Sequence, residues 1–157
     1  MDASARRVVV DASTALKWRF RDEDAAEQAL ELLRDYAAGA LERLFEPPLI
    51  DYEITNALRT GVLKGRLSET EALAALSDFA ALSIERPAFQ DTQQLALQLA
   101  CRFGRSAYDA AYLALAQANG TWFFTGDRRL FNAVGSQLDY VRWIGDYSLE
   151  SVLGQSV

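Results

Sequence analysis

The chain has 157 residues, half of them hydrophobic, which is typical of one domain with its own core. Its single cysteine, Cys101, excludes a disulfide framework within one chain and fits a reducing compartment. The lack of histidine excludes histidine-based catalysis, and a net charge of −6 taken alone argues against a nucleic-acid partner.

No run of about 18 apolar residues is present, so no segment is expected to span a membrane. The N-terminal sequence MDASARRVVVD lacks the apolar region of a signal peptide. We therefore expect a cytoplasmic protein in which residues 1–157 form a single domain.

Strands and helices alternate in the first half of the chain. A β-branched run predicts a buried strand at residues 7–10, and a second short strand is predicted at 44–46. Helices are predicted at residues 13–20, from an Asp24-Ala-Ala-Glu27 capping box to Gly39, and at 49–64.

The second half continues this alternation. A Ser68-Glu-Thr-Glu71 capping box opens a helix that runs to about Ala81. The remaining elements are a weak strand at 82–85, helices at 91–103 and 106–119, a strand at 122–125, a short helix at 128–134 and an edge strand at 140–144. Such alternation predicts an α/β fold with a parallel sheet.

Four acidic residues stand out, each in a short motif that is typical of the mouth of a strand–helix unit. They are Asp11 in VVVDASTALKW, Glu53 in LIDYEITNALR, Asp109 in SAYDAAYLALA and Asp127 in FFTGDRRLF. Each also has a structural interpretation, as a helix cap or a solvated helix charge. Helix caps do not explain why several acids would converge on one edge of a sheet, where like charges repel unless a cation neutralises them. The joint pattern therefore favours a site for a hard divalent cation.

These four motifs, in this order and spacing, resemble the PIN domain over nearly the whole chain, from Arg7 to about Tyr147. Within that superfamily, the size, the motifs and the closing VRWIGDY segment resemble the toxin ribonucleases of the VapC type. The resemblance implies an α/β, three-layer PIN-like fold, with a central parallel sheet of four or five strands flanked by helices. It also implies an endoribonuclease that depends on Mg²⁺ or Mn²⁺.

The resemblance places the family's acidic quartet on Asp11, Glu53, Asp109 and Asp127, as metal ligands and catalytic residues. It assigns supporting roles to three polar residues: Ser13 after the first Asp, Asn56 after the Glu, and Thr125 before the last acid.

Next to the quartet, Arg128 and Arg129 are candidates for contacting phosphate, with solvated surface charges as the alternative. Hydrolysis by an activated water would leave a 5′-phosphate and a 3′-hydroxyl.

The resemblance further implies an RNA substrate, a cognate antitoxin, a homodimer and a toxin–antitoxin hetero-oligomer. The antitoxin would cover a groove between the early helices, which Trp18, Phe20, Leu41 and Leu44 could line, although core packing is the alternative for them.

Two other functions remain open: a housekeeping RNA-processing nuclease with the same site, and a non-catalytic PIN-like binding module. A haloacid-dehalogenase site would need an Asp at position 13, where this chain has Ser13. A receiver domain would need a late lysine, and both lysines, Lys17 and Lys64, lie early.

Overall fold

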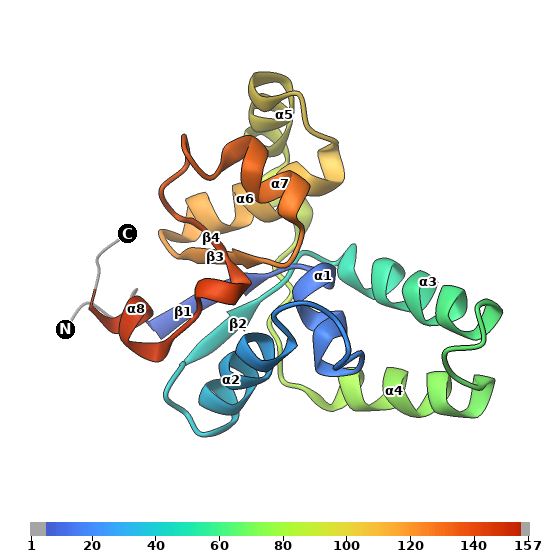
Figure 1. The fold of residues 1–157 in the computed structure, drawn as a ribbon. Coiled ribbons are helices and arrows are strands. Elements are labelled where there is room, and N and C mark those ends of the chain that lie inside the picture. Colours follow the sequence, from blue (N-terminus) through green and yellow to red (C-terminus); the bar gives the residue numbers. More distant parts are fainter. Residues whose placement is uncertain (1–5, 155–157) are drawn as a thin grey trace.

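The fold is built on a four-stranded parallel sheet, seen edge-on in the computed structural model, which describes residues 6–154 (Figure 1). Its strands are β1 (Arg7–Val10), β2 (Arg43–Phe45), β3 (Trp122–Thr125) and β4 (Val141–Trp143), in the order β2-β1-β3-β4. The prediction of an α/β fold with a parallel sheet of four or five strands is confirmed, with four strands.

The register of the strands determines which residues share the carboxyl edge of the sheet. Val9 is opposite Phe45 on one side and Phe123 on the other. The residues that follow the strands, Asp11 and Glu46, and the last residue of β3, Thr125, therefore come to the same edge. Open α/β sheets bind ligands at this edge.

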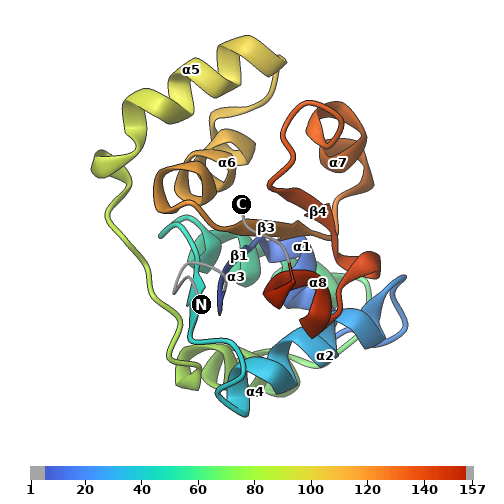
Figure 2. The same ribbon diagram turned by 90° about the vertical axis from the view of Figure 1, so that its left-hand side faces the viewer.

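Helices cover both faces of the sheet, with α5 and α6 over one face and α2 and α8 over the other (Figure 2). A hairpin of α3 and α4 projects away from the sheet (Figure 1). The helical segments are α1 (Ala12–Ala15), η2 (Leu16–Trp18), α2 (Ala26–Ala37), α3 (Ile50–Leu63), α4 (Glu69–Ala81), η3 (Phe89–Asp91), α5 (Gln93–Phe103), α6 (Ala107–Asn119), α7 (Arg128–Val134), η4 (Ile144–Asp146) and α8 (Leu149–Leu153). Within the described part of the chain, every helix is too short or too polar to cross a membrane.

Helix α6 is the buried helix that its sequence predicted. Residues 110–116 are all buried, because α6 lies against the central strands β1 and β3. The ring of Tyr112 stacks on Phe123 with 5.8 Å between ring centroids. This packing places the first turn of α6, with Asp109, beside the carboxyl edge of the sheet.

Two predicted features differ in the structure. Asp24 does not cap α2, because Ala25 occupies the N-cap in the left-handed region with φ 58°, and Asp24 instead pairs with Arg128 at 3.8 Å. The weak strand at 82–85 is reduced to one parallel bridge, between Glu85 and Phe45, since Pro87 soon ends any ladder.

The capping box at the start of α4 is confirmed. The Ser68 hydroxyl accepts a hydrogen bond from the Glu71 backbone N–H at 3.2 Å, and Glu71 Oε2 accepts one from the Ser68 N–H at 2.7 Å. This box fixes the turn between α3 and α4, and so the direction of the projecting hairpin.

Ser68→Ala should therefore lower the free energy of unfolding by about 1 kcal/mol, because it removes the hydroxyl that accepts from the Glu71 N–H. Urea unfolding followed by circular dichroism measures this. Ser77→Ala, at an exposed position inside the same helix, is the control and should change stability by less than about 0.5 kcal/mol. Equal losses for the two variants would contradict the capping role.

Candidate active site

Asp11 is the buried centre of the site, with 5% of its surface exposed. Its Oδ1 accepts hydrogen bonds from the Ser13 hydroxyl at 2.6 Å and the Thr14 N–H at 2.9 Å, and its Oδ2 accepts one from the Thr125 hydroxyl. Burial raises the pKa of Asp11, and these hydrogen bonds oppose the shift. Asp11 is also the N-cap of α1, so the capping interpretation is correct as well.

The ends of β3 and β1 are tied together by side chains at this edge. Thr125 accepts a hydrogen bond from the Asp127 N–H at 3.0 Å, and the Ser13 hydroxyl accepts one from the Gly126 N–H at 3.0 Å. A Cβ at position 126 would lie 2.9 Å from the Ser13 carbonyl oxygen and 2.6 Å from Cε of the buried Lys17. Glycine thus permits the close approach that places Thr125 on Asp11.

Glu53 joins the site from the first turn of α3. The Tyr112 hydroxyl, on α6, donates a hydrogen bond to Glu53 Oε2. Partial burial raises the pKa of Glu53, and the negative charges of Asp11 and Asp109 raise it further, against the lowering effect of the Tyr112 hydrogen bond. Asp11 and Asp109 therefore both lie within electrostatic reach of Glu53.

The other two quartet members lie at helix N-termini, Asp109 in the first turn of α6 and Asp127 as the N-cap of α7. Asp109 is half-buried in α6, and its N–H donates to the hydroxyl of the N-cap Ser106 at 3.0 Å. Asp127 caps α7, with Oδ1 accepting from the N–H groups of Arg129 at 2.8 Å and Leu130 at 3.2 Å. The Thr125 hydroxyl links the Asp127 N–H to Asp11. Within residues 6–154, no three acidic side chains are grouped closely enough to hold a metal ion.

The supporting residues divide into two groups. Ser13 and Thr125 contact Asp11 directly. Asn56 is exposed one turn after Glu53, and Arg128 turns to Asp24 and lies over the ring of Trp143 at 3.7 Å. A phosphate contact by Arg128 would require it to leave these partners.

Glu46, directly after β2, is a further buried acid that the sequence analysis did not select. Only 1% of its side chain is exposed, and neither carboxylate oxygen has a hydrogen-bond partner among the described residues. The nearest guanidinium is that of Arg86 at 3.8 Å, which also pairs with Asp51 at 3.0 Å.

Burial raises the pKa of Glu46 to about 8, and the charges of Asp51 and Asp11 add to this while Arg86 opposes it. Its place as the last residue of the strand predicted at 44–46 was the available sequence signal. Tyr112 was also missed, although it lies three residues after Asp109 and hence near the same side of α6.

Comparison with known proteins supports what the geometry indicates. The sequence model of the PIN domain matches residues 8–136. The chain belongs to the PIN-domain family.

Among curated relatives, VapC ribonuclease Mb0985 from Mycobacterium bovis is 35% identical over 123 residues, covering 78% of this chain and 87% of that protein. Ribonuclease VapC3 from Pyrobaculum aerophilum is 34% identical over 128 residues, covering 79% and 92%. The crystal structure of PAE2754 from the same archaeon superposes with a TM-score of 0.61 at 24% identity, covering 95% of this chain and 98% of the other. These relatives identify the chain as a VapC-type PIN domain, and PAE2754 shows the same fold.

The acids of this PIN domain fit a divalent cation in their chemistry. Their oxygen donors are those that Mg²⁺ and Mn²⁺ prefer. Burial raises the pKa values of Asp11 and Glu53, and the negative charges of Asp11 and Asp109 raise that of Glu53 further. A cation would oppose both effects. Because no three of the described acids converge, binding would require their side chains to move closer together.

The buried Glu46 should make stability depend on pH in a defined direction. Between its ordinary pKa of 4.5 and about 8, the folded protein keeps the Glu46 proton while the unfolded chain releases it, so stability falls as pH rises through this window. Glu46→Gln removes this effect. Relative to wild type, the variant should gain about 1–4 kcal/mol between pH 5 and pH 8.

Urea unfolding in EDTA at the two pH values measures this gain. Glu27→Gln, at an exposed position of α2, is the matched control and should show no such pH-dependent gain. A Glu46→Gln effect of the same size at pH 5 and pH 8 would show that Glu46 is not a buried, proton-binding group.

Proposed function

We propose that this chain is a metal-dependent endoribonuclease that cleaves RNA, and the toxin of a toxin–antitoxin pair. The observation that carries the proposal is the buried Asp11 carboxylate, held at the sheet edge by Ser13 and Thr125, with Glu53 within electrostatic reach. The ribonuclease names of its VapC relatives support the same reaction. Carboxylates that repel one another are suited to holding a cation against phosphate.

We assign the principal metal contacts to Asp11 and Asp109, with Glu53 and Asp127 contributing directly or through water. A bound Mg²⁺ or Mn²⁺ would supply Lewis-acid activation of water and stabilisation of the charge that develops on phosphate. Such ions keep several waters, which suits a site whose acids come from four separate elements.

The chain's own residues orient these acids. Ser13 and Thr125 donate to opposite oxygens of Asp11, which fixes the plane of its carboxylate and favours the charged form. The Tyr112 hydroxyl likewise donates to Glu53 Oε2, which favours the charged form of Glu53. The raised pKa of Tyr112 keeps this hydroxyl protonated, so that it can donate. Water attack would yield 5′-phosphate and 3′-hydroxyl ends. The route through the 2′-hydroxyl lacks its usual histidine acid–base pair in this chain.

The decisive test compares wild type with Asp11→Asn, both purified without a partner protein and incubated with total RNA. We expect wild type to cleave RNA with Mg²⁺ or Mn²⁺ and not with EDTA. Asp11→Asn should lose at least about 100-fold in rate, because it removes the buried negative charge. Mapping the product ends measures the reaction and should find 5′-phosphates.

Asp91→Asn, at an exposed aspartate of η3, is the charge-matched control and should cleave like wild type. Circular dichroism should show that both variants are folded. Cleavage that survives EDTA and Asp11→Asn would refute the proposed mechanism. Absence of cleavage by folded wild type would favour the non-catalytic binding module, and processing of one cellular precursor would favour the housekeeping nuclease.

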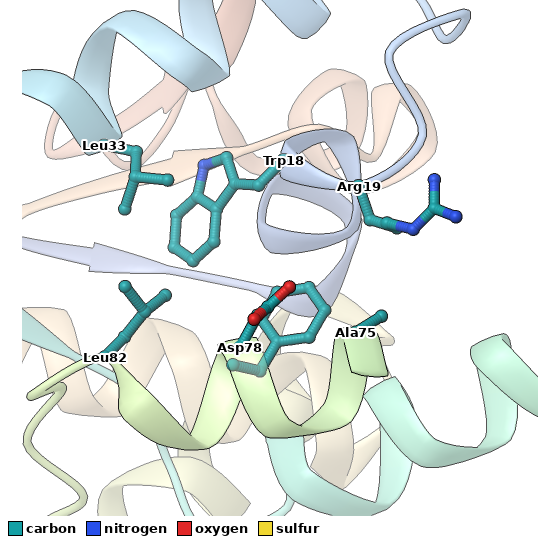
Figure 3. Close-up of a pocket in the computed structure, with 7 residues that line it drawn as sticks. Trp18, Arg19, Leu33, Ala75, Asp78 and Leu82 are labelled. Carbon is teal, nitrogen blue, oxygen red and sulfur yellow. The ribbon is translucent and has the colours of Figure 1, made fainter. Parts of the chain in front are cut away.

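We also propose a site for the antitoxin, in a cavity of about 150 Å³ between η2, α2 and α4 (Figure 3). Trp18, Leu33 and Leu82 line it with apolar surface, and Arg19 and Asp78 also line it (Figure 3). Of the other residues considered for this role, Phe20, Leu41 and Leu44 are buried in the core and do not line the cavity. We expect a homodimer that assembles with the antitoxin into a larger complex.

A charge in this cavity should weaken antitoxin binding. Leu33→Glu should lower the affinity for the co-expressed product of the adjacent gene by at least about tenfold, because docking would then bury an unpaired carboxylate. Leu97→Glu, on the exposed face of α5, is the control and should bind like wild type. Calorimetry measures both affinities. Equal affinities for Leu33→Glu and Leu97→Glu would contradict this site.

A further inference from the structure

We propose that an exposed strip of α3 binds single-stranded RNA beside the acidic site, with a base stacked on Tyr52 and a phosphate paired with Arg59. The strip consists of Tyr52, Asn56 and Arg59, and the proposal rests on the proposed function. These residues are spaced by four and then three positions, so they lie along one side of the helix. Together with Asp51 and Thr55 they line a surface hollow.

The strip begins next to a candidate catalytic acid. Tyr52 directly precedes Glu53, so when Glu53 turns inward to Tyr112, the side chain of Tyr52 points into solvent. Tyr52 is 81% exposed, the largest exposed fraction among the large hydrophobic side chains of the described residues. The next most exposed aromatic ring, Tyr108 at 68%, directly precedes Asp109. Two free aromatic faces thus flank the acids, as in proteins that stack unpaired bases.

Arg59 supplies a free cation at the other end of the strip. Its guanidinium forms no ion pair or hydrogen bond with any residue in the described range 6–154. By contrast, Arg86, which also approaches this part of α3, is held by Asp51 at 3.0 Å. That pair also neutralises the one acid that lines the hollow. An unpaired guanidinium has the planar donor geometry that phosphate accepts.

The pattern of an aromatic ring, an amide and a guanidinium selects single strands over duplexes. A ring can stack on a base only where that base is unpaired, and every base has a face on which it can stack. The Asn56 amide, between the ring and the cation, can donate to and accept from a base edge.

The test measures binding of a labelled, mixed-sequence RNA of about 12 nucleotides by fluorescence anisotropy. All variants carry Asp11→Asn so that the probe is not consumed. Tyr52→Ala should weaken single-strand binding by about tenfold without changing its salt dependence, and Tyr52→Trp should restore binding. Arg59→Ala should lower the slope of log affinity against log salt by about 0.7. A blunt duplex of the same sequence should show no effect of Tyr52→Ala.

Arg34→Ala, at an exposed arginine of α2 whose side chain pairs with no residue in the range 6–154, is the matched control and should change neither affinity nor slope. The proposal is overturned if Tyr52→Ala binds single strands like its parent, or if the parent binds none. It is also overturned if Tyr52→Ala weakens binding of the protein encoded by the adjacent gene but not binding of RNA, which would assign the strip to a protein partner.

Cleavage by the protein with native Asp11 separates the two levels of the proposal. A protein that cleaves RNA but binds it independently of Tyr52 refutes the strip alone. A protein that binds RNA through Tyr52 but never cleaves it refutes the nuclease and supports the strip.

Discussion

The buried carboxylate of Asp11 is the constraint on which the rest of the site depends. Removing such a group from water is costly unless hydrogen bonds compensate for it. Its three donors come from two parts of the chain: Ser13 and Thr14 follow β1 directly, whereas Thr125 ends β3, more than a hundred residues later. The pairing of β1 with β3 and the start of α1 must therefore both be correct before Asp11 can be buried. The site and the centre of the fold are stabilised by the same contacts.

The second constraint is repulsion among acids. Asp11 and Asp109 raise the pKa of Glu53, and Asp11 contributes to the raised pKa of Glu46. The fold tolerates these charges through single, local contacts, with Tyr112 on Glu53 and Arg86 near Glu46. A site of this kind is electrostatically unfavourable without a cation, and the energy that a cation would recover is available for binding it.

The net charge of −6 is consistent with an RNA substrate once the charges are placed. Many of the arginines pair with acids at the periphery, as Arg66 does with Asp22 and Glu23. Arg59 keeps its charge unpaired on α3, close to the candidate active site. The proposed substrate strip on α3 and the proposed antitoxin cavity between η2, α2 and α4 use different residues. RNA binding and antitoxin binding can therefore be altered separately.

The amino-acid sequence by itself determined the fold class, most element positions and the place of Asp11 at the end of β1. These follow from local signals: the β-branched run before Asp11, the apolar helix after Asp109 and the capping box at Ser68. The sequence could not show that Asp24 fails as a cap, because that depends on the left-handed backbone of Ala25.

Tertiary structure alone decided which polar groups meet. The contact of Thr125 with Asp11, the contact of Tyr112 with Glu53 and the burial of Glu46 depend on strand register and helix packing between distant segments. Sequence patterns record the periodicity of each element on its own. The partners of a buried side chain depend instead on how whole elements pack together, which no single element specifies.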